Sequence, residues 1–143
     1  MNAFTSNALR KQEDQACEFS HDYVRIDGRR IHCITAGQGA PVLLIPGWPQ
    51  TWYAWRHVMQ ALAAQGFQAI AVDPPGTGFS DRPDTGYDTG SIALTLHRTM
   101  LALGHERYQV AGHDVGMWVA YALASDQPQA VQSLALTEAV IPG

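Results

Sequence analysis

The sequence predicts an α/β fold, a three-layer sandwich in which a mostly parallel sheet is packed between helices. Short apolar runs alternate along the chain with segments of helical periodicity, which is the pattern that successive βα units produce. Most of these runs are unbroken, as expected for parallel strands that are buried on both faces. The 143 residues are 46% hydrophobic and 15% charged, so the chain can form one core and is too apolar to be disordered.

The first two strands are expected to form an antiparallel hairpin. Residues 23–26 and 30–35 read as strands whose side chains alternate between two faces. They are separated by Asp27-Gly28, a dipeptide typical of two-residue turns between antiparallel strands. Residues 1–20 form a polar segment ahead of the domain, which we place at 21–143.

The remaining elements alternate between strand and helix. Strands are predicted over 41–45, 67–72, 108–111 and 131–136, and helices over 52–64, 91–103 and 117–125. Gly66 and Gly104 follow the first two helices and are typical stop signals. Residues 73–80 contain too much proline and glycine for a helix or a strand and are predicted to be a loop.

Composition argues against several classes of partner. The net charge is −4 and no large cluster of Lys and Arg is present, so neither nucleic acid nor an anionic membrane is an expected partner. Residues 1–20 lack the apolar run that a secretory signal or a membrane span requires. A cytoplasmic location is therefore predicted.

No metal and no organic cofactor is predicted. The two cysteines, Cys17 and Cys33, lack CxxC spacing, so we expect reduced thiols rather than a disulfide framework or a thiolate metal site. The segment Gly76-Thr77-Gly78 lacks the further glycine of a dinucleotide-binding loop and the lysine of a phosphate-binding loop.

The segment Gly112-x-Asp114-x-Gly116 is the strongest candidate for chemistry. It lies between a predicted strand and a predicted helix, the setting of a nucleophile elbow, in which a tight turn exposes one side chain. A carboxylate at this position attacks carbon directly and forms an alkyl ester, which suits epoxides and alkyl halides. The alternative is that Asp114 is an ordinary N-cap of the following helix.

Three segments, in this order, resemble the motifs of epoxide hydrolases of the α/β-hydrolase superfamily. They are Pro46-Gly47-Trp48-Pro49 with the following residues to Arg56, Asp73-x-x-Gly76-x-Gly78-x-Ser80, and Gly112-His113-Asp114-x-Gly116. The resemblance covers residues 23–143, and haloalkane dehalogenases share the framework. It implies an α/β-hydrolase fold that stops after about the sixth strand, so that 21–143 would be the N-terminal part of the core domain.

The resemblance also implies roles for four residues. Asp114 matches the nucleophile, and the backbone N–H groups of Trp48 and Val115 match those that hold the oxyanion while the ester is hydrolysed. Glu138, just beyond the last predicted strand, matches the acid that orients a catalytic histidine in one subgroup. The alternative for Glu138 is a solvated loop carboxylate. His113 is expected to point away from Asp114 and to be structural.

Two residues depart from the family pattern. Pro46 stands where the oxyanion loop usually begins with histidine, and Val115 stands where many relatives, dehalogenases above all, carry tryptophan. A dehalogenase uses that indole N–H to stabilise the leaving halide, so Val115 favours an epoxide over a halide substrate. A haloalkane dehalogenase-type hydrolase and a non-catalytic binding protein remain alternatives.

The family's base histidine and two lid tyrosines would lie beyond Gly143. We therefore expect a fragment that is inactive alone and that attacks an electrophile at most once. The expected partner is a small molecule, an epoxide or related electrophile. The strand predicted over 131–136 would be an open, apolar edge, which favours poor solubility or a homodimer.

Overall fold

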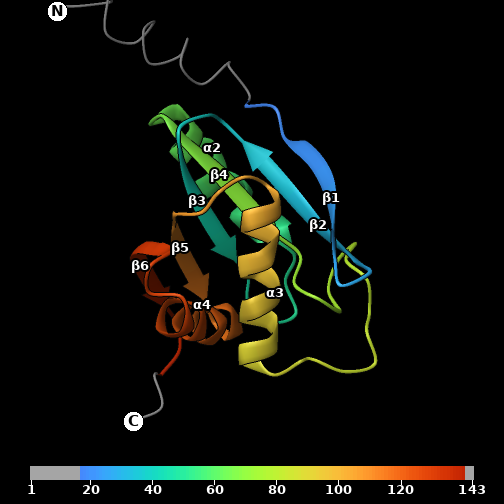
Figure 1. The fold of residues 1–143 in the computed structure, drawn as a ribbon. Helices are drawn as coiled ribbons and strands as arrows, with labels where there is room; N and C mark the ends of the chain where they lie inside the picture. Colours follow the sequence, from blue (N-terminus) through green and yellow to red (C-terminus); the bar gives the residue numbers. More distant parts are fainter. Residues whose placement is uncertain (1–16, 141–143) are drawn as a thin grey trace, which may run out of the picture.

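The computed structural model describes residues 17–140 and contains one six-stranded sheet with helices on both faces (Figure 1). The strands are β1 Ser20–Ile26, β2 Arg29–Ala36, β3 Ala40–Ile45, β4 Phe67–Val72, β5 Tyr108–His113 and β6 Val131–Thr137. The helices are the 3-10 helix η1 Trp52–Trp55, then α2 Arg56–Ala64, α3 Thr89–Ala102 and α4 Val115–Asp126. The predictions for residues 1–16 and 141–143 lie outside the described residues.

The sheet is mixed and mostly parallel, as predicted. Its strand order is β1-β2-β4-β3-β5-β6, with β1, β2 and β4 paired antiparallel and β4, β3, β5 and β6 paired parallel. The predicted hairpin turn is confirmed, because Asp27 and Gly28 both have positive φ, 50° and 81°. That conformation matches the twist of two antiparallel strands joined by two residues.

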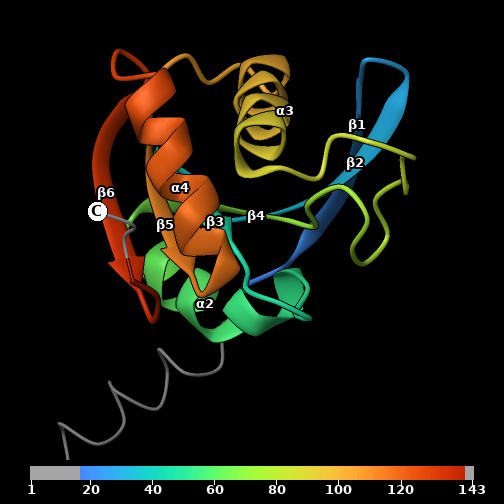
Figure 2. The same cartoon turned by 90° about the horizontal axis from the view of Figure 1, so that it is seen from below.

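Both faces of the central strands β3 and β4 are covered, which explains why these strands are apolar without alternation. Figure 2 shows α2 on one face and α3 with α4 on the other. Consecutive strand residues face opposite layers. Leu43 belongs to the core under α3 and α4, whereas its neighbour Leu44 belongs to the core under α2. Ile70 and Ala71 of β4 divide in the same way.

The first predicted helix differs from the observed one. Instead of one helix over 52–64, the chain forms the 3-10 turn η1, and α2 begins only at Arg56. The backbone N–H of Trp52 is held by the carboxylate of Asp73 at 2.8 Å, and Thr51 accepts the N–H of Tyr53 with its side chain. These local bonds compete with a regular first turn. Of the residues of α2, Met59 is buried, whereas its neighbour Val58 is 41% exposed.

The largest departure lies around the predicted elbow. β5 continues through Gly112 and His113, where it pairs with β3 and β6, and α4 begins immediately at Val115. Sequence patterns predicted a strand that ends at residue 111 and a helix that begins at 117. A single residue, Asp114, therefore joins strand to helix.

Candidate active site

Asp114 has an unusual backbone conformation for a residue with a side chain. Its φ is 54° and its ψ is −126°, a combination that L-residues rarely adopt and that tends to occur at functional sites. Its side chain makes no capping hydrogen bond to α4, whereas Asp88 accepts the N–H of Ser91 at the start of α3. This geometry differs from the ordinary N-cap that was the alternative.

Glycines on both sides are required by the closeness of strand and helix. A Cβ on Gly112 would collide with the carbonyl oxygen of Gly116. A Cβ on Gly116 would collide with the end of β3, at 2.5 Å from the carbonyl oxygen of Pro46. Gly47 is constrained by the elbow itself, since its Cβ would lie 2.6 Å from the Cβ of Asp114. Larger residues at these positions would force the turn apart.

One backbone donor holds the carboxylate of Asp114: the N–H of Trp48 donates to Oδ2 at 2.9 Å. This bond is the first cause that holds the pKa of Asp114 below its usual value. The nearby N–H of Val115 and, to a smaller extent, His113 act in the same direction, although partial desolvation opposes them. The carboxylate is therefore ionised at neutral pH, and the two predicted oxyanion donors are next to it.

Glu138 lies at the end of β6, beside the elbow. Its backbone φ is 67°, and its Oε2 lies 3.7 Å from Nε2 of His113, an ion-pair distance too long for a hydrogen bond. The preceding residue, Thr137, accepts the backbone N–H of Asp114 at 3.1 Å. The structure thus brings Glu138 to the residue before the nucleophile candidate, while its side chain remains 73% exposed.

A pocket of about 420 Å³ adjoins the elbow. It lies between the loops that follow β3 and β4 and the first turns of α3 and α4, from which Ile92 and Val119 contribute. Both residues that depart from the family pattern, Pro46 and Val115, line it. Its volume is in the range of small-molecule sites.

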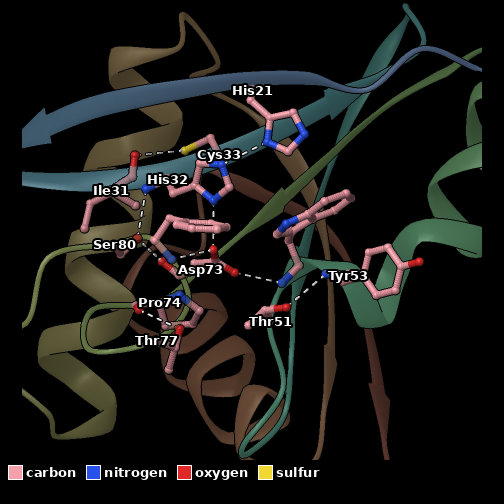
Figure 3. A network of polar contacts seen from close by, with 12 residues as sticks. His21, Ile31, His32, Cys33, Thr51, Tyr53, Asp73, Pro74, Thr77 and Ser80 are labelled. Atoms are coloured by element: carbon pink, nitrogen blue, oxygen red, sulfur yellow. Dashed lines mark hydrogen bonds and ion pairs between the residues drawn. The ribbon is translucent and has the colours of Figure 1, made fainter.

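A buried polar network that sequence reasoning missed supports the two loops (Figure 3). Asp73, at the end of β4, is fully buried and accepts hydrogen bonds from three places. They come from the backbone N–H of Trp52 at 2.8 Å, from that of Phe79 at 3.1 Å, and from the ring of His32 at 2.8 Å. His32 is 1% exposed and in turn contacts Nδ1 of His21 at 3.0 Å. One carboxylate therefore fixes β2 and both loops relative to each other.

Ser80 completes this network. Its hydroxyl donates to the backbone carbonyl of Asp73 and accepts the backbone N–H of His32 at 2.8 Å (Figure 3). The sequence predicted only a loop at Ser80 and indicated no role for His32. The signals that could have found them are the aspartate and serine at the two ends of one motif and a histidine between the apolar residues Ile31 and Cys33 of β2.

The cysteines offer no reactive thiolate or metal site beside these groups. Cys33 is buried and its pKa is raised to about 12, first by burial and then by Asp22 and Asp73, so its thiol is a poor nucleophile. Within residues 17–140 both cysteines are free and no group of three or more His, Cys, Asp or Glu side chains is arranged to hold a metal ion. In the same range, no helix is long and apolar enough to cross a membrane.

Comparison with known families agrees with this geometry. A family model described as the alpha/beta hydrolase fold matches residues 40–142. The chain belongs to the α/β-hydrolase fold family. The fold predicted from the sequence, a mostly parallel sheet with helices on both faces, is confirmed.

The relatives to which this chain is similar include proteins named as an epoxide hydrolase and as a dehalogenase. The soluble epoxide hydrolase of Corynebacterium sp. (strain C12) is 42% identical over 126 residues, which is 88% of this chain and 43% of that protein. A fluoroacetate dehalogenase of Burkholderia sp. is 31% identical over 129 residues, 87% of this chain and 42% of that protein. The crystal structure of Cfl2 from Burkholderia cenocepacia superposes with a TM-score of 0.81 at 40% identity, covering 91% of this chain and 48% of that one. The chain thus spans less than half the length of these relatives.

Proposed function

We propose that this chain carries the nucleophile of an epoxide-hydrolase-type enzyme, and that the nucleophile is Asp114. The observation that supports the proposal most is that its ionised carboxylate lies on a one-residue turn, where the N–H of Trp48 donates to it. The similarity to a protein named soluble epoxide hydrolase points to the same substrate class. The partner is a small electrophile, and a cytoplasmic location is part of the same proposal.

The first chemical step is a displacement at carbon. Because Oδ2 is held by Trp48, Oδ1 of Asp114 is the oxygen that is free to attack a ring carbon. The new C–O bond forms as the ring C–O bond breaks, and the electron pair stays on the ring oxygen, which then takes a proton. The product is a hydroxyalkyl ester of Asp114.

The second step regenerates the carboxylate. Water attacks the ester carbon of Asp114, the carbonyl electrons move onto its oxygen, and the N–H groups of Trp48 and Val115 stabilise that oxyanion. Collapse releases the diol, which keeps the oxygen that attacked, and the carboxylate retains one oxygen from water. A base must activate this water. We propose that Glu138 orients a histidine for this step in the complete enzyme, and that the present chain alone stops at the ester.

Intact-protein mass spectrometry tests the nucleophile directly. The chain is incubated with small terminal epoxides, and a mass increase of one epoxide that maps to the peptide containing Asp114 is the expected result. Asp114→Asn is expected to give no adduct. Asp126→Asn, which changes an exposed carboxylate at the other end of the same helix, is the matched control and is expected to react like the parent. Equal labelling of all three chains would contradict the proposal.

The second candidate, a dehalogenase, is favoured by one observation, the similarity to a fluoroacetate dehalogenase. The same carboxylate would displace a halide instead of opening a ring. Val115 offers no indole N–H beside Asp114, and Trp48, 70% exposed, lies at the mouth of the pocket. If alkyl halides form the adduct and release halide while epoxides form no adduct, the dehalogenase function is favoured. Absence of any adduct, with ligand binding retained in Asp114→Asn, would favour a non-catalytic binding protein.

A further inference from the structure

We propose that His21 and His32 are positioning residues for the reaction at Asp114. Together with Asp73 they form a triplet of hydrogen-bonded side chains, and this triplet holds in place the loop that carries the N–H of Trp48. The inference deepens the proposed function, on which it rests for the reaction that is followed. It also makes a claim about hydrogen bonds within the protein, and that claim does not require any reaction to occur.

The triplet runs from the surface of the protein to its interior (Figure 3). Nδ1 of the exposed His21 lies 3.0 Å from Nε2 of His32, and Nδ1 of His32 lies 2.8 Å from Oδ2 of the buried Asp73. The planes of the two rings differ by 22°, and their centroids are 5.2 Å apart. Because the facing nitrogens are only 3.0 Å apart, they lie between the two ring centres. The rings therefore meet edge to edge in an N–H···N hydrogen bond.

The bonds to Asp73 determine which ring nitrogens carry protons. The backbone N–H groups of Trp52 and Phe79 can only donate, and each occupies one oxygen of the carboxylate. We therefore assign Asp73 as an acceptor throughout and Nδ1 of His32 as its third donor. His32 is buried, where a charged ring would lose its hydration, so its Nε2 is an acceptor without a proton. His21 supplies the N–H that this buried nitrogen needs.

Both ends of the triplet contact Trp52. At the buried end, Oδ1 of Asp73 accepts the backbone N–H of Trp52 at 2.8 Å. At the exposed end, the ring of His21 packs against the indole of Trp52 at an angle of 87°, with the centroids 5.2 Å apart. Phe19 packs on the same indole. Loss of either end of the triplet therefore changes the surroundings of Trp52, the residue with which η1 begins.

Trp52 lies just beyond the turn that contains the proposed oxyanion donor. This turn, residues 47–50, is closed by a backbone hydrogen bond of 2.9 Å between its first and last members. Trp48 within the turn donates to Asp114 at 2.9 Å, while Trp52 after the turn donates to Asp73. Because a closed turn moves as a unit, a shift of Asp73 also displaces the N–H of Trp48. The triplet thereby positions the attacking carboxylate without touching it.

Nitrogen NMR of the histidine side chains tests the triplet in the unmodified chain, so the outcome does not depend on the folding of a variant. The ring of His32 is expected to carry a proton on Nδ1 alone. A scalar coupling across the hydrogen bond is expected between Nδ1 of His21 and Nε2 of His32. A proton on Nε2 of His32 would overturn the proposal, because His21 would then not be the donor.

Variants of His21 test whether its N–H positions Trp48. His21→Phe keeps an aromatic ring beside Trp52 but has no N–H, whereas His21→Asn places an amide N–H where Nδ1 lies. The amide proton signal of Trp48, which reports its bond to the carboxylate, is expected to move in His21→Phe and to stay near its parent position in His21→Asn. His57→Phe, at an exposed position of α2, is the matched control and is expected to leave that signal in place.

The rate at which a small terminal epoxide alkylates Asp114 connects the triplet to the reaction. His21→Phe is expected to lower the maximal rate of adduct formation about tenfold and to leave the half-saturating epoxide concentration unchanged, because orientation and not binding is affected. His21→Asn is expected to restore the rate. A parent-like rate and Trp48 signal in His21→Phe, or a His21→Asn variant that behaves like His21→Phe, would overturn the proposal. If the Trp48 signal responds as expected but the parent forms no adduct, only the covalent function is refuted.

Discussion

The backbone N–H of Trp48 donates to the carboxylate of Asp114 across a sequence separation of 66 residues, at 2.9 Å. The bond joins the loop after β3 to the turn after β5, and these two strands are neighbours in the sheet. Parallel neighbours end at the same edge, so two loops distant in sequence become adjacent there. The proposed nucleophile and its proposed oxyanion donor are positioned by that topology.

Replacing Asp114 by glycine is expected to stabilise the fold. Glycine adopts the backbone conformation of φ 54° without steric penalty, while any L-residue is strained there. Urea denaturation is expected to show a higher midpoint for Asp114→Gly than for the parent. The matched change Asp126→Gly, inside the last turn of α4, is expected to lower it, since glycine disfavours helix. A larger loss for Asp114→Gly than for Asp126→Gly would contradict the strain argument.

Acid is expected to remove the contribution of the Asp88 cap. Hydrogen bonds from Ser91 hold the pKa of Asp88 below its usual value of 3.8. A carboxyl group whose pKa is lower in the folded state stabilises the fold above its unfolded pKa, and loses that effect as the pH falls through the folded pKa. Asp88→Ala should therefore lower the urea midpoint at pH 6 and have little effect at pH 2. Equal losses at both pH values would show that the cap does not act through its charge.

The buried carboxylate of Asp73 is expected to be important for stability. Removing it leaves three hydrogen-bond donors unpaired, those of Trp52, Phe79 and His32. Asp73→Ala is expected to reduce the free energy of unfolding by about 3 to 5 kcal/mol, measured by urea denaturation. Asp73→Asn keeps one acceptor oxygen and should cost less, and Asp84→Ala in the exposed loop should be close to neutral. A neutral Asp73→Ala would mean that the network does not hold the loops.

The open edge of the sheet is expected to drive association of the isolated chain. Within the described residues β6 pairs only with β5, and Leu134 of β6 is exposed. Sedimentation at rising concentration is expected to show species larger than the 15.6 kDa monomer. Leu134→Lys should shift the population toward monomer, whereas Leu94→Lys on α3 should not. A sharply melting monomer at high concentration would contradict this prediction and the predicted homodimer.

Sequence patterns predicted the order and type of almost every element. A strand that is buried on both faces is a short, unbroken run of apolar residues, such as Leu43-Leu44-Ile45, and such a run is easy to identify. They failed where local hydrogen bonds outweigh periodicity, as at Trp52, where a single helix was expected. The end of β5 was missed for a related reason. Gly112 looks like a turn residue, yet it is required inside the strand to let α4 approach.

Motifs placed Asp114, Trp48 and Val115 together because each occupies a fixed position after a strand. They did not reveal the bond between His32 and Asp73, which are 41 residues apart and belong to different motifs. The pairing of Glu138 with His113 was also not foreseen, since it depends on the register of β6 against β5. Pocket shape is the least predictable feature from sequence, because side chains from several elements contribute to one surface.

The bonds that Asp73 accepts from Trp52 and Phe79 come from main-chain atoms, so they persist whatever side chains those positions carry. The positions of the two loops therefore depend on backbone atoms, whereas the surface of the pocket depends on side chains such as those of Pro46 and Val115. A single substitution at either position would therefore change the surface of the pocket while the backbone of both loops stays in place.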